Sequence, residues 1–134
     1  INLKMIYIEG VELKEVHQSD LKPFPQLEVI SFYHNKLETL EKDLFKFNPN
    51  LNTFGANFNK ISFIHPDVFD HLHSLTSLRI NGNPCGLSHA DKNRQRVLEI
   101  IVHMKEQCSA IKTEVLDDLI VDDCQVSLSV TKPT

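Results

Sequence analysis

Apolar residues recur along the chain with a period of 24 residues. Leu3, Leu27, Leu51 and Leu75 each open the same pattern, with an apolar residue three and five positions later. The alternation of apolar and polar positions within each copy predicts a short strand with one buried face. Repetition at a fixed period of this length predicts a solenoid, in which stacked copies share one core and their strands form a parallel sheet.

Five positions in each copy are expected to be apolar and to point inward. Counted from the opening leucine, they are positions 1, 4, 6, 11 and 14. They are Leu3, Ile6, Ile8, Leu13 and Val16 in the first copy, Leu27, Ile30, Phe32, Leu37 and Leu40 in the second, and Leu51, Phe54, Ala56, Ile61 and Ile64 in the third. Phe45 and Phe69 recur at a further offset, which predicts a second apolar ladder on the return side of the solenoid.

Position 9 is asparagine in three of the four copies, at Asn35, Asn59 and Asn83. The chain turns inward here, and its buried backbone groups have no partners in the strand ladder. A side-chain amide both donates and accepts, so we expect these asparagines to bond the backbone of neighbouring turns. Val11 stands at this position in the first copy, which is therefore expected to be a degenerate terminal repeat.

The pattern changes after the fourth copy, at Asn83-Pro84-Cys85. Apolar residues between Ser88 and Cys108 recur at helical spacing and predict a helix, with Ser88 or Asp91 as its N-cap. Such a helix would cover the open end of the last repeat. Further on, residues 114–123 predict a second short helix or turn.

These features resemble the extracellular leucine-rich repeat proteins of animals. The copies are similar to the repeat L-x-x-L-x-L-x-x-N-x-L-x-x-L, and Cys85, the helix, Cys108 and Cys124 are similar to that family's cysteine-containing C-terminal cap. The resemblance covers roughly residues 3–124. It implies an α/β solenoid that coils to the right, with a short parallel sheet on its concave face and a helical cap. The expected regions are repeats over 1–84, the cap over 85–124, and a tail or edge strand over 125–134.

The resemblance also implies a disulfide between Cys85 and Cys108. The usual cap has four cysteines and this chain has three, so Cys124 lacks its expected partner. Three interpretations remain: a buried free thiol, a bond to another chain, or a bond to Cys85 or Cys108 that leaves the other free. The chain begins at Ile1 without a leader or an N-terminal cysteine cap. We therefore expect that any signal peptide has already been removed. We also expect either that a longer protein has been trimmed or that something else covers the open N-terminal end.

Composition and motifs narrow the classes of function. The net charge of −4 offers no general basic field for nucleic acid, and no apolar run is long enough to span a membrane. Nucleophile elbows, phosphate-binding glycine loops and paired-cysteine zinc motifs are absent from the sequence. We therefore expect no catalytic residues, no cofactor and no metal. The remaining clusters are interpreted as solvated surface, namely His65, His71 and His73 on a loop, and Lys92, Arg94 and Arg96 beside the helix.

In the architecture that the resemblance implies, the outward strand positions line the concave face. Tyrosine and arginine are enriched at protein-interface hot spots, which makes Tyr33, His34, Phe58 and Arg79 the leading candidate cluster. The expected ligand-binding residues are Tyr7, Glu9, Ser31, Tyr33, His34, Asn57, Phe58, Arg79 and Asn81.

The leading hypothesis is a non-enzymatic module, secreted or on the cell surface, that binds another protein through the concave face. In the resembling family, such modules serve in innate immunity, receptor ectodomains and adhesion. The alternative is an assembly module that forms a homodimer through Cys124 or the open N-terminal end. An intracellular scaffold is a third hypothesis, and a reducing cytosol would keep Cys85 and Cys108 as thiols.

Overall fold

The computed structural model describes residues 2–109, and its strands repeat with the period of the sequence. The elements are β1 (Met5–Tyr7), α1 (Gln18–Leu21), β2 (Val29–Ser31), β3 (Thr39–Leu40), β4 (Thr53–Gly55), β5 (Phe63–Ile64), β6 (Ser77–Arg79), β7 (His89–Ala90) and α2 (Arg94–Gln107). The predicted features of residues 110–134, including Cys124, lie outside the described residues. Within the described part, no helix is long and apolar enough to cross a membrane.

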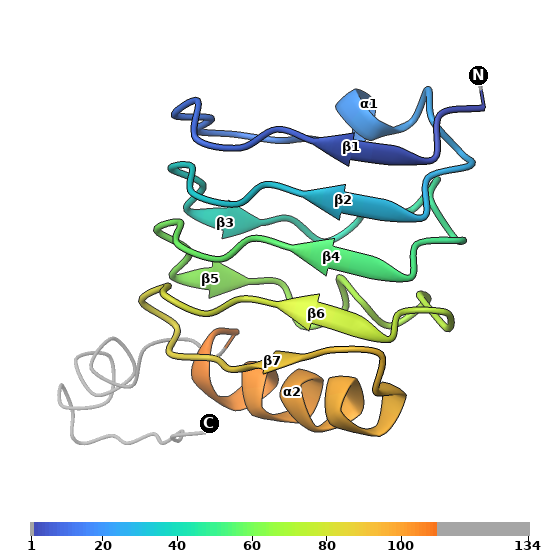
Figure 1. Ribbon diagram of the computed structural model, residues 1–134. Helices are drawn as coiled ribbons and strands as arrows, with labels where there is room; N and C mark the ends of the chain where they lie inside the picture. Colours follow the sequence, from blue (N-terminus) through green and yellow to red (C-terminus); the bar gives the residue numbers. More distant parts are fainter. Residues whose placement is uncertain (1, 110–134) are drawn as a thin grey trace, which may run out of the picture.

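Five strands form one sheet in the order β1-β2-β4-β6-β7, and β3 pairs with β5 in a second sheet. Along the first sheet Met5 pairs with Val29, Val29 with Thr53, and Thr53 with Ser77, so each partner is one 24-residue step further along the chain. Figure 1 shows these strands stacked in order, with α2 beyond β7. The mostly parallel sheet suits the predicted solenoid.

The segment after the last repeat differs from the prediction. The expected helix from Ser88 to Cys108 begins only at Arg94, and the preceding residues form β7, which pairs antiparallel with β6. The sheet is therefore not wholly parallel. The N-cap is Asn93, whose side chain accepts a hydrogen bond from the backbone of Arg96 at 3.0 Å.

Neither of the two expected N-caps is positioned to cap α2, because each side chain bonds elsewhere. The Ser88 hydroxyl accepts from the Arg96 guanidinium at 2.9 Å. The Asp91 carboxylate accepts from Arg79 at 2.7 Å. The prediction of Ser88 or Asp91 as the cap was therefore wrong.

The core is continuous through the second and third copies. All ten inward residues predicted for these two copies are buried. On the return side, the rings of Phe45 and Phe69 stack with their centroids 6.0 Å apart, and Phe54 packs against both. This aromatic ladder agrees with the prediction from the phenylalanine spacing.

The first copy is less buried than its pattern predicts. Leu3 and Ile8 were expected to point inward, yet each is 38% exposed. In the described part of the chain no strand lies beyond β1, so the described residues leave this end of the core uncovered. The same periodic pattern therefore gives full burial only where a copy has a neighbour on both sides.

The repeated asparagines hold successive turns together. The Asn59 amide donates to Phe32 O at 2.9 Å and to Ala56 O at 3.1 Å, and its oxygen accepts from Leu37 N at 3.0 Å. Asn83 makes the equivalent bonds one turn later, and Asn35 one turn earlier. Each asparagine thus bonds its own turn and the turn before it, as buried polar groups require.

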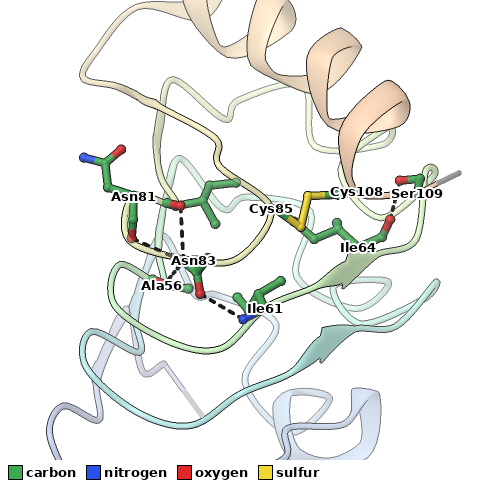
Figure 2. Close-up of a disulfide and its surroundings, with 9 residues drawn as sticks. Ala56, Ile61, Ile64, Asn81, Asn83, Cys85, Cys108 and Ser109 are labelled. Carbon is green, nitrogen blue, oxygen red and sulfur yellow. Dashed lines mark hydrogen bonds between the residues drawn. A yellow bond between two sulfur atoms is a disulfide. The ribbon is translucent and has the colours of Figure 1, made fainter. Parts of the chain in front are cut away.

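A disulfide joins Cys85, at the end of the last repeat, to Cys108, which follows α2, with the two Cα atoms 5.3 Å apart. Ile64 N donates to Cys108 O at 3.2 Å, and the Ser109 hydroxyl donates to Ile64 O. Figure 2 shows the disulfide lying between α2 and the strand that carries Ile64. The end of α2 is therefore tied to the last repeat by one covalent bond and to Ile64 on β5 by two hydrogen bonds.

His17 links the first copy to the second and should make the stability of this end depend on pH. Its ring nitrogens lie 3.0 Å from a Glu41 oxygen and 2.8 Å from a Glu15 oxygen. These hydrogen bonds, first to Glu41 and then to Glu15, raise the pKa of His17 above its ordinary value of 6.5. The stabilisation is complete below that ordinary value and is lost as the pH rises through the raised pKa.

We therefore expect the wild-type protein to lose more stability than His17→Gln between about pH 5.5 and about pH 8.5. Urea unfolding of both proteins at the two pH values measures this difference. Because the ring is exposed, the effect should be small and should shrink in high salt. Equal pH dependence in the two proteins would show that the ring does not bind the carboxylates when protonated.

Candidate protein-binding face

The outer face of the five-stranded sheet carries the fifth and seventh positions of each copy. The fifth positions are Tyr7, Ser31, Gly55 and Arg79, and the seventh are Glu9, Tyr33, Asn57 and Asn81. A hollow of about 530 Å³ lies on this face. Six of the nine expected ligand-binding residues line the hollow, namely Tyr7, Glu9, Ser31, Tyr33, Asn57 and Arg79. Side chains from four successive copies therefore meet at one place.

Polar contacts hold both ends of the hollow. At the β1 end, the Ser31 hydroxyl donates to a Glu9 oxygen at 2.6 Å. At the β7 end, Nε and a terminal nitrogen of Arg79 lie 2.7 Å and 2.5 Å from one Asp91 oxygen. Both partners of this ion pair are close to half exposed, so the pair adds little to stability, but it orients the guanidinium over the face.

Two charged residues near the hollow were missed by the sequence analysis. Asp91 and Lys92 follow β7, which returns beside β6 and brings both to the last copy. The Lys92 backbone N donates to the Ser77 hydroxyl at 2.9 Å, which fixes the segment there. A periodic pattern cannot place these residues, because they follow the last copy and belong to no repeat.

Two expected ligand-binding asparagines have contacts within the protein. Asn81 N donates to the side-chain oxygen of Asn57 at 2.8 Å. The Asn81 amide lies 3.2 Å from a ring nitrogen of His89 on β7. Asn57 lines the hollow, whereas Asn81 does not. These residues hold the ends of the strands in place, and Asn57 also presents its amide to the hollow.

Tyr33, His34 and Phe58 form an aromatic corner beyond the ends of β2 and β4. The Tyr33 ring meets the His34 and Phe58 rings edge to face, with centroids 5.9 Å and 5.7 Å away. Phe58 is 51% exposed and Tyr33 42%. Among the three, only Tyr33 also lines the hollow. The expected cluster is thus divided, because Arg79 lies across the hollow in its pair with Asp91.

The corner arises from a left-handed backbone at the eighth position of each copy. His34 and Phe58 both have φ of +59°, and the first and fourth copies have glycine there, at Gly10 and Gly82. Glycine adopts this conformation readily, whereas a bulky residue is rare in it. The two glycines were the signal in the sequence that could have predicted this turn.

Several residues of the other clusters noted in the sequence have partners inside the protein. The Arg94 guanidinium donates to Leu72 O at 3.1 Å and to Leu75 O at 2.8 Å, so it anchors α2 and is not a solvated cation. The His71 ring lies 2.8 Å from Phe45 O, and the His65 ring accepts from Asp67 N at 3.1 Å. These contacts give the three residues structural roles on the return side.

Comparison with known proteins agrees with the geometry. The model of the leucine rich repeat family matches residues 34–84, which supports a leucine-rich repeat protein. No curated protein matches the chain. Leucine-rich repeat domains generally mediate protein–protein interactions and are typically non-enzymatic.

Proposed function

We propose that this protein is a secreted or cell-surface module that binds another protein through the outer face of its five-stranded sheet. The observation that carries the proposal is that Tyr7, Tyr33 and Arg79, from three different copies, line one hollow. Tyrosine and arginine are the residues that most often dominate binding energy. Here Tyr7 and Arg79 stand on short paired strands and Tyr33 follows β2 closely, so little order is lost on binding. The face is taken as the concave side of a right-handed solenoid, and innate immunity, receptor ectodomains and adhesion are the proposed settings.

Binding through this face predicts a specific loss of affinity on substitution. Peptides selected from a displayed library on the folded protein serve as the probe. Tyr33→Ala and Arg79→Ala should each lower the affinity for the selected peptides by about tenfold, as truncation of a hot-spot residue does. Phe63→Ala, an exposed aromatic on β5 of the second sheet, is the control and should bind normally. Peptides that tolerate both face substitutions and fail on Phe63→Ala would place binding on the other sheet.

The disulfide supports the secreted location, because such bonds persist in oxidising compartments. The mass of the denatured, alkylated chain without reductant tests it. We expect a monomer with one alkylated cysteine, consistent with a single bond between Cys85 and Cys108. Three alkylated cysteines in freshly isolated protein would contradict secretion and favour the intracellular scaffold.

Assembly is the second candidate function, and the open end beyond β1 favours it. Met5 and Val11 are exposed there, and a mainly apolar hollow of about 510 Å³ is lined by residues that include Ile6, Ile8 and Phe24. A second copy seated on this end would bury these groups. Light scattering tests the idea, since Val11→Glu should convert a dimer into monomers. A chain of twice the mass that collapses on reduction would instead indicate a covalent link through a cysteine, with Cys124 as its candidate.

A further inference from the structure

Gly55 lies at the centre of the outer face, and the fold does not require a glycine there. Its strand, β4, is flanked by β2 and β6, and Gly55 is not among the residues with positive φ. A Cβ atom built at Gly55 would meet the Ser31 hydroxyl at 3.8 Å and Arg79 Cβ at 4.0 Å, which are ordinary contacts. Glycine inside a strand weakens it and often marks a close approach by a ligand.

Gly55 has no side chain, so its buried backbone forms the floor of the hollow there, and the space above it is called the opening. Its paired neighbours are Ser31 on β2 and Arg79 on β6, and Ser77 lines the hollow beside Thr53. Tyr7 and Tyr33 stand on one side, and the Arg79 guanidinium stands on the other. The opening is therefore bounded by two rings and by a planar cation whose orientation Asp91 holds.

The charges around the opening balance, which argues against a charged occupant. Glu9 and Asp91 carry negative charge, and Arg79 and Lys92 carry positive charge. Arg79 is already paired with Asp91, so a carboxylate that bound Arg79 would have to displace that partner. An incoming cation would meet Arg79 across the opening. An uncharged planar ring has neither penalty and can stack on the face of a guanidinium.

We propose that Gly55 receives an aromatic side chain of the partner protein, which lies between the tyrosines and the guanidinium of Arg79. This inference rests on the proposed function, because it names the chemistry of the partner at that same face. It also explains why a strand-weakening residue stands in the most enclosed strand of the sheet. The ring would fill the space that any larger residue at position 55 would occupy.

Gly55→Val tests the proposal, because it fills the opening with a residue that favours strands. The substitution should keep the fold and raise the melting temperature by about 2 to 5 °C, since glycine weakens a strand. Gly55→Ala is the smaller second variant, and the contacts of its Cβ show that it fits. Thr39→Val, at the exposed residue of β3, is the control for introducing a valine into a strand away from the face.

The first probe is N-acetyl-tryptophanamide, followed through the backbone amide resonances of Gly55 and Ser31. It should shift these resonances in the wild-type protein and in Thr39→Val, and leave the equivalent resonances of Gly55→Val unchanged. The corresponding N-acetyl amides of lysine and aspartate should not shift these resonances in any of the proteins. Shifts by a charged amide alone, or equal shifts by the tryptophan amide in Gly55→Val, would overturn the proposal.

The second probe is a peptide selected on the wild-type protein. Replacing its aromatic anchor by alanine should cost about tenfold in affinity on the wild type and almost nothing on Gly55→Val, as a double-mutant cycle of contacting residues requires. Equal losses on both proteins would overturn the aromatic contact. If Tyr33→Ala and Arg79→Ala still weakened binding of the peptide, the proposed function would stand without the aromatic contact. If no substitution on the face changed the affinity of the peptides, both the aromatic contact and the proposed function would be overturned.

Discussion

Replacing Asn59 with alanine should lower the free energy of unfolding by about 3 kcal/mol. The Asn59 side chain is buried in the middle of the repeats, and its oxygen accepts from Leu37 N at 3.0 Å. Without it, that backbone donor has no partner and no access to water. The two carbonyls that bond Asn59 lose less, because Phe32 O keeps its bond from Asn35 and Ala56 O keeps its bond from Asn83.

Two other substitutions separate this effect from simple loss of packing. Asn35→Ala should cost less, about 1 to 2 kcal/mol, because its partners Val11 and Leu13 lie at the exposed end where water can replace the amide. Asn59→Asp keeps the acceptor for Leu37 but turns a carboxylate toward two carbonyl oxygens. Its stability should therefore improve as acid protonates the carboxylate.

Urea unfolding of the three variants gives these differences, with Asn50→Ala on an exposed turn as the control. Equal losses for Asn35→Ala and Asn59→Ala would mean that position in the repeats does not matter. In that case the cost would arise from the side chain itself and not from a stranded backbone donor.

The repeating part of the fold could be predicted because one pattern is tested several times along the chain. A single apolar triplet such as Leu51, Phe54 and Ala56 is weak evidence for a strand. Its recurrence at a constant offset predicts which residues pair, and the observed pairing of Thr53 with Ser77 follows that offset. The asparagines were predicted for the same reason, because their chemistry matters only at a turn that recurs.

Prediction failed where a contact does not recur from one copy to the next. His89 and Ala90 form β7 because the edge of β6 is available, and no local propensity shows this. Asn48 is a further example: its buried amide donates to Leu21 O and Phe24 O, at a position where the other copies have no asparagine. A side chain that serves one turn alone leaves no periodic signal.

The candidate site was predicted in part, because strand positions show which side chains share a face but not how much space they leave. By its place in the repeat, Gly55 is only one residue in the column of fifth positions. The space at Gly55 depends on Ser31 and Arg79, whose atoms lie 3.8 Å and 4.0 Å from the place of an added Cβ. The placement of His34 and Phe58 at a corner depends on their positive φ angles. Their residue types do not predict such angles, because bulky side chains rarely adopt them.

The disulfide should contribute about as much stability as the central asparagine. The cross-link spans 23 residues, from Cys85 to Cys108, for which the chain-entropy model gives about 3 kcal/mol. The double variant Cys85→Ala/Cys108→Ala should lose this amount. It should also loosen the end of α2, because Cys108 O and Ser109 meet Ile64 only while that segment is held in place.

Thermal unfolding with and without reductant checks the assignment of this loss. Reductant should lower the melting temperature of the wild-type protein to that of the double variant and leave the double variant unchanged. Cys124→Ser, which keeps both bonded cysteines, is the control and should respond to reductant as the wild type does. A wild-type protein indifferent to reductant would show that α2 is held by Val97, Ile100, Ile101 and Met104, its buried side chains, and not by the covalent bond. The bond would then be dispensable for stability.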